Sequence, residues 1–146
     1  MRYFDTSFLT PLIRQEKTSS RVARFVAELT TGDLAISRWT GVEVASLLAR
    51  DVRMGVITGD EARKADALFE DIVRASFAVV SPGGSDYALA RRYLHNYQTG
   101  LRAGDALHLA IAGNHGAEII YSLDKSMIKA GKVLDLPVSD GIRAEL

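Results

Sequence analysis

The 146-residue sequence contains no cysteine. This absence excludes disulfides, thiolate zinc sites, iron–sulfur clusters and cysteine nucleophiles. An excess of charge of one sign is also lacking, because 18 basic side chains balance 18 acidic ones. Without a global basic field, a nucleic-acid partner would have to be bound by a local patch of cations. No apolar run approaches the roughly 20 residues of a membrane span, and Asp5 interrupts the first apolar stretch. We therefore expect a cytoplasmic protein without a signal peptide and without a membrane partner.

The composition is that of an ordinary globular domain. Hydrophobic residues make up 47% of the chain and charged residues 25%. The sequence shows no repeat, no low-complexity tract and no linker rich in proline or serine. Because a domain usually has about 100–200 residues, we predict one domain over residues 1–146.

Short apolar segments alternate with segments of helical period from one end of the chain to the other. The predicted strands are residues 2–4, 34–37, 77–80, 118–122 and 136–138. The predicted helices cover about residues 7–13, 19–29, 41–52, 60–72, 85–97, 103–114 and 124–132. Alternation with short, all-apolar strands predicts a three-layer α/β/α domain with a central, mainly parallel sheet. The order of the strands in that sheet does not follow from the sequence.

Four carboxylates fall at predicted strand ends or helix starts: Asp5, Glu43, Asp105 and Asp124. Functional groups of an open parallel sheet gather beyond the carboxyl ends of its strands, so we expect these acids to converge. Each acid taken alone also has a structural interpretation. Asp5 and Asp124 could be helix N-caps, Glu43 could form a capping box with Thr40, and Asp105 could interact with the helix dipole.

A converging group of carboxylates is mutually repulsive unless protons or cations neutralise it. Hard oxygen ligands in a chain without cysteine favour Mg²⁺ or Mn²⁺. One such ion, or two ions about 3.5–4 Å apart, can make hydroxide available for phosphodiester hydrolysis. The pattern therefore predicts a metal-dependent nuclease that needs no serine, cysteine or histidine nucleophile.

Four short segments occur in a characteristic order and spacing. They are Tyr3–Ser7, Ile36-Ser37 followed by Glu43-Val44, Asp105–Ala110, and Ser122–Asp124. In these segments the chain resembles the PIN-domain ribonucleases, and most closely the VapC-type toxins of bacterial and archaeal toxin–antitoxin pairs. The resemblance covers nearly the whole chain and implies a three-layer PIN fold.

The resemblance also implies roles for individual residues. The implied catalytic residues and ligands of Mg²⁺ or Mn²⁺ are Asp5, Glu43, Asp105 and Asp124. The hydroxyl positions that would orient the acids or a water are Thr6, Ser7 and Ser122. Some relatives have a further acid soon after the last aspartate, where this chain has Lys-Ser-Met-Ile at 125–128. The number of metal ions, one or two, therefore stays open.

Several partners are implied as well. The substrate would be RNA (tRNA, rRNA or mRNA), and a cognate antitoxin would place its C-terminal segment in the active-site groove. Family members commonly form homodimers, and they reach DNA only indirectly, through the antitoxin. From the sequence itself, the candidate contacts to RNA phosphates are Arg91, Arg92 and Arg102, which flank the Asp105 segment.

Other interpretations remain open at this stage. The chain could be a non-catalytic PIN-fold module that binds a partner protein, in which case it would show no saturable affinity for Mn²⁺. A phosphoacceptor receiver domain fits less well, because the next acid after Asp5 is Glu16 rather than a close neighbour. His108, one turn after Asp105, could be a metal ligand or a hydrogen-bonded packing residue. Trp39 could stack on a base or lie in a protein interface.

Overall fold

A five-stranded sheet forms the centre of the computed structural model, which describes residues 1–30 and 32–142. The strands are β1 (Arg2–Phe4), β2 (Leu34–Ser37), β3 (Ala78–Val80), β4 (Ile119–Tyr121) and β5 (Val138–Ser139). They lie in the order β3-β2-β1-β4-β5, and every neighbouring pair is parallel. The predicted parallel sheet is confirmed.

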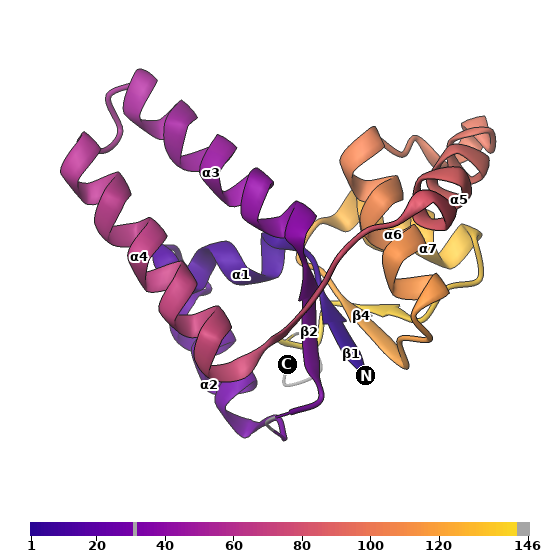
Figure 1. Cartoon of the computed structure of the whole chain (residues 1–146), viewed down its shortest axis with the longest axis horizontal. Coiled ribbons are helices and arrows are strands. Elements are labelled where there is room, and N and C mark those ends of the chain that lie inside the picture. The colour runs from indigo at the N-terminus through magenta and orange to yellow at the C-terminus, as the bar shows by residue number, and fades with distance from the viewer. Residues whose placement is uncertain (31, 143–146) are drawn as a thin grey trace.

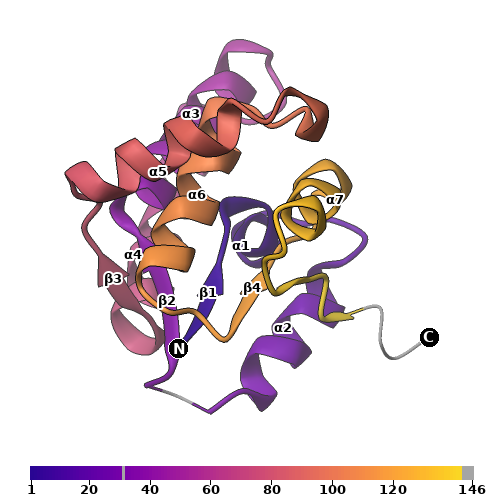
Figure 2. The same cartoon turned by 90° about the vertical axis from the view of Figure 1, so that its right-hand side faces the viewer.

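Helices cover both faces of this sheet (Figures 1 and 2). One group is α1 (Thr6–Ile13), α2 (Ser19–Glu28), α3 (Arg38–Arg53) and α4 (Gly59–Ser76). The other group is α5 (Gly84–Leu94), α6 (Ala103–Asn114) and α7 (Lys125–Val133), with a 3₁₀ turn at Tyr97–Thr99. Successive strand residues point to opposite faces, so Phe4 packs in the core of the first group and Tyr3 in the core of the second. The predicted three-layer α/β/α architecture is confirmed.

Several helix starts differ from the prediction. α3 begins at Arg38, three residues before the predicted Gly41, so Glu43 lies inside the helix and the proposed capping box with Thr40 is wrong. α5 begins at Gly84, one residue before the predicted start, and it ends at Leu94 rather than near residue 97. The capping box that does form joins Thr58 and Glu61 at the start of α4. Local cap patterns recur by chance, and tertiary packing decides which of them form.

The strand order places a topological switch point between β1 and β4. From β1 the chain adds β2 and β3 on one side of the sheet, and later β4 and β5 on the other. Ligands of such sheets bind in the crevice at the carboxyl ends of the two strands where the order reverses. Asp5 follows β1 directly, and Ser122 follows β4. The fold therefore points to this edge as the functional site.

No helix within residues 1–30 and 32–142 is long and apolar enough to cross a membrane.

Candidate active site

Asp5 is the buried centre of the switch point. It is the N-cap of α1, and its Oδ1 accepts hydrogen bonds from the Phe8 amide at 3.1 Å and from Ser7 Oγ at 2.7 Å. Its Oδ2 accepts from Ser122 Oγ at 2.6 Å. Only 3% of Asp5 is exposed, and this burial raises the pKa of its carboxyl group. The N-cap interpretation of Asp5 is correct, and the carboxylate also links the ends of β1 and β4.

Three of the predicted acids line a common cavity of about 580 Å³ beside Asp5: Glu43, Asp105 and Asp124. Asp105 lies in the first turn of α6 and makes no capping bond, whereas Asp124 caps α7 by accepting from the Ser126 amide at 2.8 Å. The pKa of Asp105 is raised to about 6, first by burial and then by the charges of Asp124, Asp5 and Glu43. The structure thus brings all four predicted acids into electrostatic contact.

The Glu43 carboxylate is held in place by two side chains. Thr6 Oγ1 donates to Glu43 Oε1 at 2.6 Å, and His108 Nε2 forms a short contact with the same oxygen. Burial alone would raise the pKa of Glu43, but the interactions with His108 and Thr6 outweigh it, so the pKa is lowered. Glu43 is therefore an oriented, ionised carboxylate at neutral pH.

His108 is a buried connection between the sheet and the acids. It is 1% exposed, and its Nδ1 lies 2.8 Å from the Tyr3 hydroxyl, which in turn donates to Ser37 Oγ at 3.0 Å. Both ring nitrogens thus have protein partners. This arrangement supports the interpretation of His108 as a hydrogen-bonded packing residue rather than a metal ligand.

The three predicted arginines are separated by the fold. Arg102 lines the acidic cavity. Arg91 and Arg92 are exposed in the last turn of α5, outside the residues that line this cavity. Of the three, Arg102 alone has the position expected of a phosphate contact within the site.

Comparison with known protein families shows to which family this chain belongs. The PIN domain family matches residues 2–133. The chain belongs to the PIN domain family. No significant match is found among curated proteins.

Solved structures show that the fold of this PIN domain is shared at low sequence identity. VapC20 of Mycobacterium tuberculosis, described as a toxin that cleaves the sarcin–ricin loop, is 20% identical with a TM-score of 0.73, over 90% of this chain and 95% of that one. VapBC-1 of nontypeable Haemophilus influenzae is 16% identical with a TM-score of 0.68, over 96% and 98%. VapBC2 of Rickettsia felis, bound to a DNA fragment from its promoter, is 14% identical with a TM-score of 0.68, over 95% and 98%.

The acids of this PIN domain suit a hard divalent cation by donor type and charge. Cysteine is absent, and no lysine or arginine among the described residues forms an ion pair with Asp105 or Asp124. Burial raises the pKa of Asp105, and the charges of Asp124, Asp5 and Glu43 raise it further. No group of three histidine, aspartate or glutamate side chains in the described ranges already has the proximity of a metal site. The donor set fits Mg²⁺ or Mn²⁺, although its side chains do not form a coordination shell.

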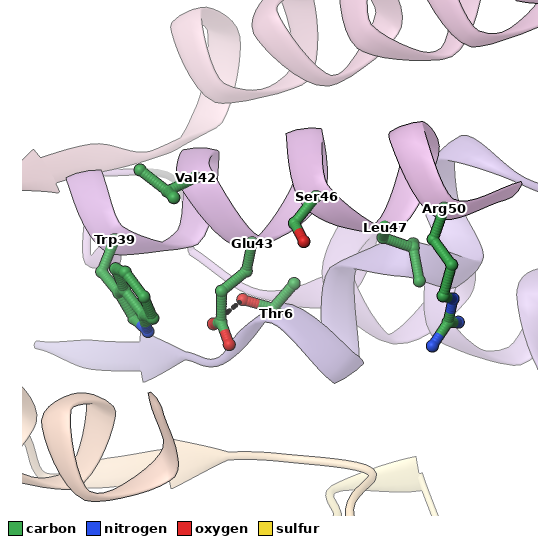
Figure 3. Close-up of a pocket in the computed structure, with 7 residues that line it drawn as sticks. All are labelled: Thr6, Trp39, Val42, Glu43, Ser46, Leu47 and Arg50. Atoms are coloured by element: carbon green, nitrogen blue, oxygen red, sulfur yellow. Dashed lines mark hydrogen bonds between the residues drawn. The ribbon is translucent and has the colours of Figure 1, made fainter. Parts of the chain in front are cut away.

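A second cavity continues along α3 and was missed by sequence reasoning. It has a volume of about 400 Å³, and its lining includes Trp39, Glu43, Leu47 and Arg50 (Figure 3). Figure 3 shows Trp39 on one side of Glu43, and Leu47 and Arg50 further along the helix. Residues four and seven positions after Glu43 share its helix face, so the spacing could have revealed this groove.

Gly104, in the first turn of α6, lies close to the Glu43 carboxylate. A Cβ atom there would lie 3.0 Å from Glu43 Oε2 and 3.4 Å from Trp39 Nε1. We expect Gly104→Ala to displace the Glu43 carboxylate and to lower any catalytic activity of the site by about 10-fold. Because the displaced atom ends a side chain, the free energy of unfolding should change by less than about 1 kcal/mol.

Nuclease assays and urea denaturation of the purified variant test this prediction. Gly41→Ala is the matched control, because a Cβ at Gly41 meets no atom within 4 Å. Equal activity of the two variants would show that the position of Glu43 is not critical.

Proposed function

We propose that this PIN domain is a metal-dependent endoribonuclease and the toxin of a toxin–antitoxin pair. The observation that carries the proposal is the position of Glu43, Asp105 and Asp124 around one cavity, beside the buried Asp5 at the switch point. Such a carboxylate cluster attracts cations and would repel an anionic substrate if no cation were bound. The similarity to VapC20, a toxin that cleaves the sarcin–ricin loop, supports RNA as the substrate class.

Two of the four acids are held in place by neighbouring side chains. Asp5 is held by Ser7 and Ser122, and Glu43 by Thr6 and His108, so neither carboxylate has to be ordered during the reaction. Asp105 and Asp124 line the cavity together with Glu43, and they complete the donor set for Mg²⁺ or Mn²⁺. When bound, such an ion makes hydroxide available near neutral pH and neutralises negative charge that develops on phosphate oxygens.

Arg102 supplies a positive charge to the acidic cavity. It lines the same cavity as Asp105, so its guanidinium can bind a non-bridging oxygen of the phosphodiester that is cleaved. The hydroxyl groups of Thr6, Ser7 and Ser122 orient the acids and take no covalent part. We also propose that residues 1–146 form a single domain.

The proposed partners follow from the relatives. The similarity to VapBC-1 and VapBC2 supports a cognate antitoxin, and the promoter DNA in the VapBC2 structure supports contact with DNA through that antitoxin. We also propose that the protein forms a homodimer. We further propose a cytoplasmic location, because the RNA substrate and the antitoxin would meet the enzyme there.

Incubation of the purified protein with total tRNA and rRNA in Mn²⁺ tests the activity. We expect discrete fragments that disappear when EDTA is added. We also expect Mn²⁺ to raise the melting temperature, because an ion that binds only the folded state stabilises it by RT ln(1 + [L]/Kd), about 2.7 kcal/mol at 100 times Kd.

Matched measurements separate the two functions that the sequence left open. Asp66 is an exposed acid on α4, outside the acidic cavity, so Asp66→Asn serves as a control. This variant should cleave RNA and respond to Mn²⁺ like the wild type. If the wild type shows neither cleavage nor a Mn²⁺-dependent melting temperature, the chain is a non-catalytic PIN-fold binding module instead.

A further inference from the structure

Three lysines share one exposed face of α7. Lys125, Lys129 and Lys132 are separated by four and three residues, which places them on the same side of the helix. All three are exposed, and with Ile128 and Asp140 they line a cavity of about 300 Å³. The three ammonium groups and the one carboxylate give this surface an excess of positive charge.

The helix that carries this lysine face starts at the candidate active site. α7 starts directly after its N-cap Asp124, and Ser126 lines the acidic cavity. From Lys125 to Lys132 the helix rises about 10 Å, because each residue adds about 1.5 Å. This distance equals the rise of about three nucleotides stacked at about 3.4 Å each. The lysine face is therefore long enough to follow a short stretch of a nucleic-acid strand away from the acids.

Charge gives the reason why the site needs such a surface. The four acids repel an RNA backbone, and the net charge of the chain is zero, so attraction to RNA has to come from cations near the acids. Arg102 provides one such cation inside the acidic cavity. The lysine face provides three more along a single direction.

We propose that Lys125, Lys129 and Lys132 bind consecutive phosphates of the RNA strand that flanks the cleaved bond. The inference rests on the proposed nuclease function and adds the direction in which the strand leaves the acids. Lysines recognise phosphates as point charges, so the contact would be independent of base sequence. The face would thus raise affinity for RNA without selecting the cleavage site.

Binding of a fluorescein-labelled single-stranded RNA, measured by anisotropy in EDTA at several KCl concentrations, tests the proposal. The variant is Lys129→Gln with Lys132→Gln; Lys125 is kept because it adjoins Asp124. The control is Lys17→Gln with Lys64→Gln, which changes the net charge equally at exposed positions outside α7. The slope of log K against log[KCl] is negative, and each lost phosphate contact should reduce its magnitude by about 0.7. We therefore expect the magnitude to fall by about 1.4 in the variant and by less than about 0.3 in the control.

Cleavage of a dinucleotide and of a long RNA in Mn²⁺ completes the test. The α7 variant should cleave the dinucleotide at the wild-type rate and the long RNA with a KM raised about 10-fold or more. If the wild type cleaves RNA and the α7 variant matches the control in both assays, the lysine face is not an RNA site and the nuclease proposal stands. If the wild type neither binds nor cleaves RNA, both proposals are wrong.

Discussion

Asp105→Asn is expected to lower RNA cleavage by at least about 100-fold and, at the same time, to make the fold more stable. The loss of activity follows because asparagine keeps the size of the Asp105 side chain but removes a carboxylate that lines the acidic cavity. The gain in stability follows from the raised pKa of Asp105, about 6, because its ionised form is penalised by burial and by three neighbouring acids. At pH 7.5 and without metal, we expect the variant to be about 1–2 kcal/mol more stable, after allowing for partial solvent screening.

The pH dependence has a definite sign. The folded state holds the Asp105 proton up to a pH of about 6, whereas the unfolded chain releases it near the ordinary aspartate value of about 3.9. The folded state therefore binds more protons between these values, and the stability of the wild type falls as the pH rises through this window. The advantage of Asp105→Asn should be largest above pH 6 and should disappear near pH 4.

Urea denaturation in EDTA at pH 7.5 and pH 4, with cleavage assays in Mn²⁺, measures these effects. Asp66→Asn serves as the control, since it removes an exposed carboxylate of α4. Added Mn²⁺ should stabilise the wild type and the control but not Asp105→Asn. An Asp105→Asn variant that retains full activity would exclude Asp105 from the active site.

His108→Ala is expected to cost about 3–4 kcal/mol of stability, the largest loss that we predict for a single site. The imidazole is 1% exposed, so its removal leaves a cavity in the core. The buried Tyr3 hydroxyl would lose its 2.8 Å partner, and Glu43 would lose one of the two groups that hold it. We therefore expect weaker catalysis in the folded fraction as well.

The free energy of unfolding from urea melts measures this effect. His95→Ala is the control, because His95 is exposed at the end of α5, and its loss should stay within about 0.5 kcal/mol. A cost below about 1 kcal/mol for His108→Ala would mean that the hydrogen bonds of the imidazole do not stabilise the fold.

The alternation of apolar and helical segments could be interpreted without the structure because burial imposes its period on the sequence. The segment 103–114 is apolar on nearly all sides, and the structure buries all of Ala106–Ala112. The four acids could also be located, since the carboxyl ends of parallel strands meet at one edge. These features depend on local sequence, so the sequence by itself determined the layers, the parallel sheet and the set of candidate acids.

The tertiary structure alone decided how these parts meet. The strand order and its switch point depend on crossover paths that no local pattern encodes. The same holds for the division into buried Asp5 and open Asp105, and for the contact of His108 with Glu43. Each of these brings together side chains from distant segments, and their burial and charge depend on the packing between them rather than on their own neighbours.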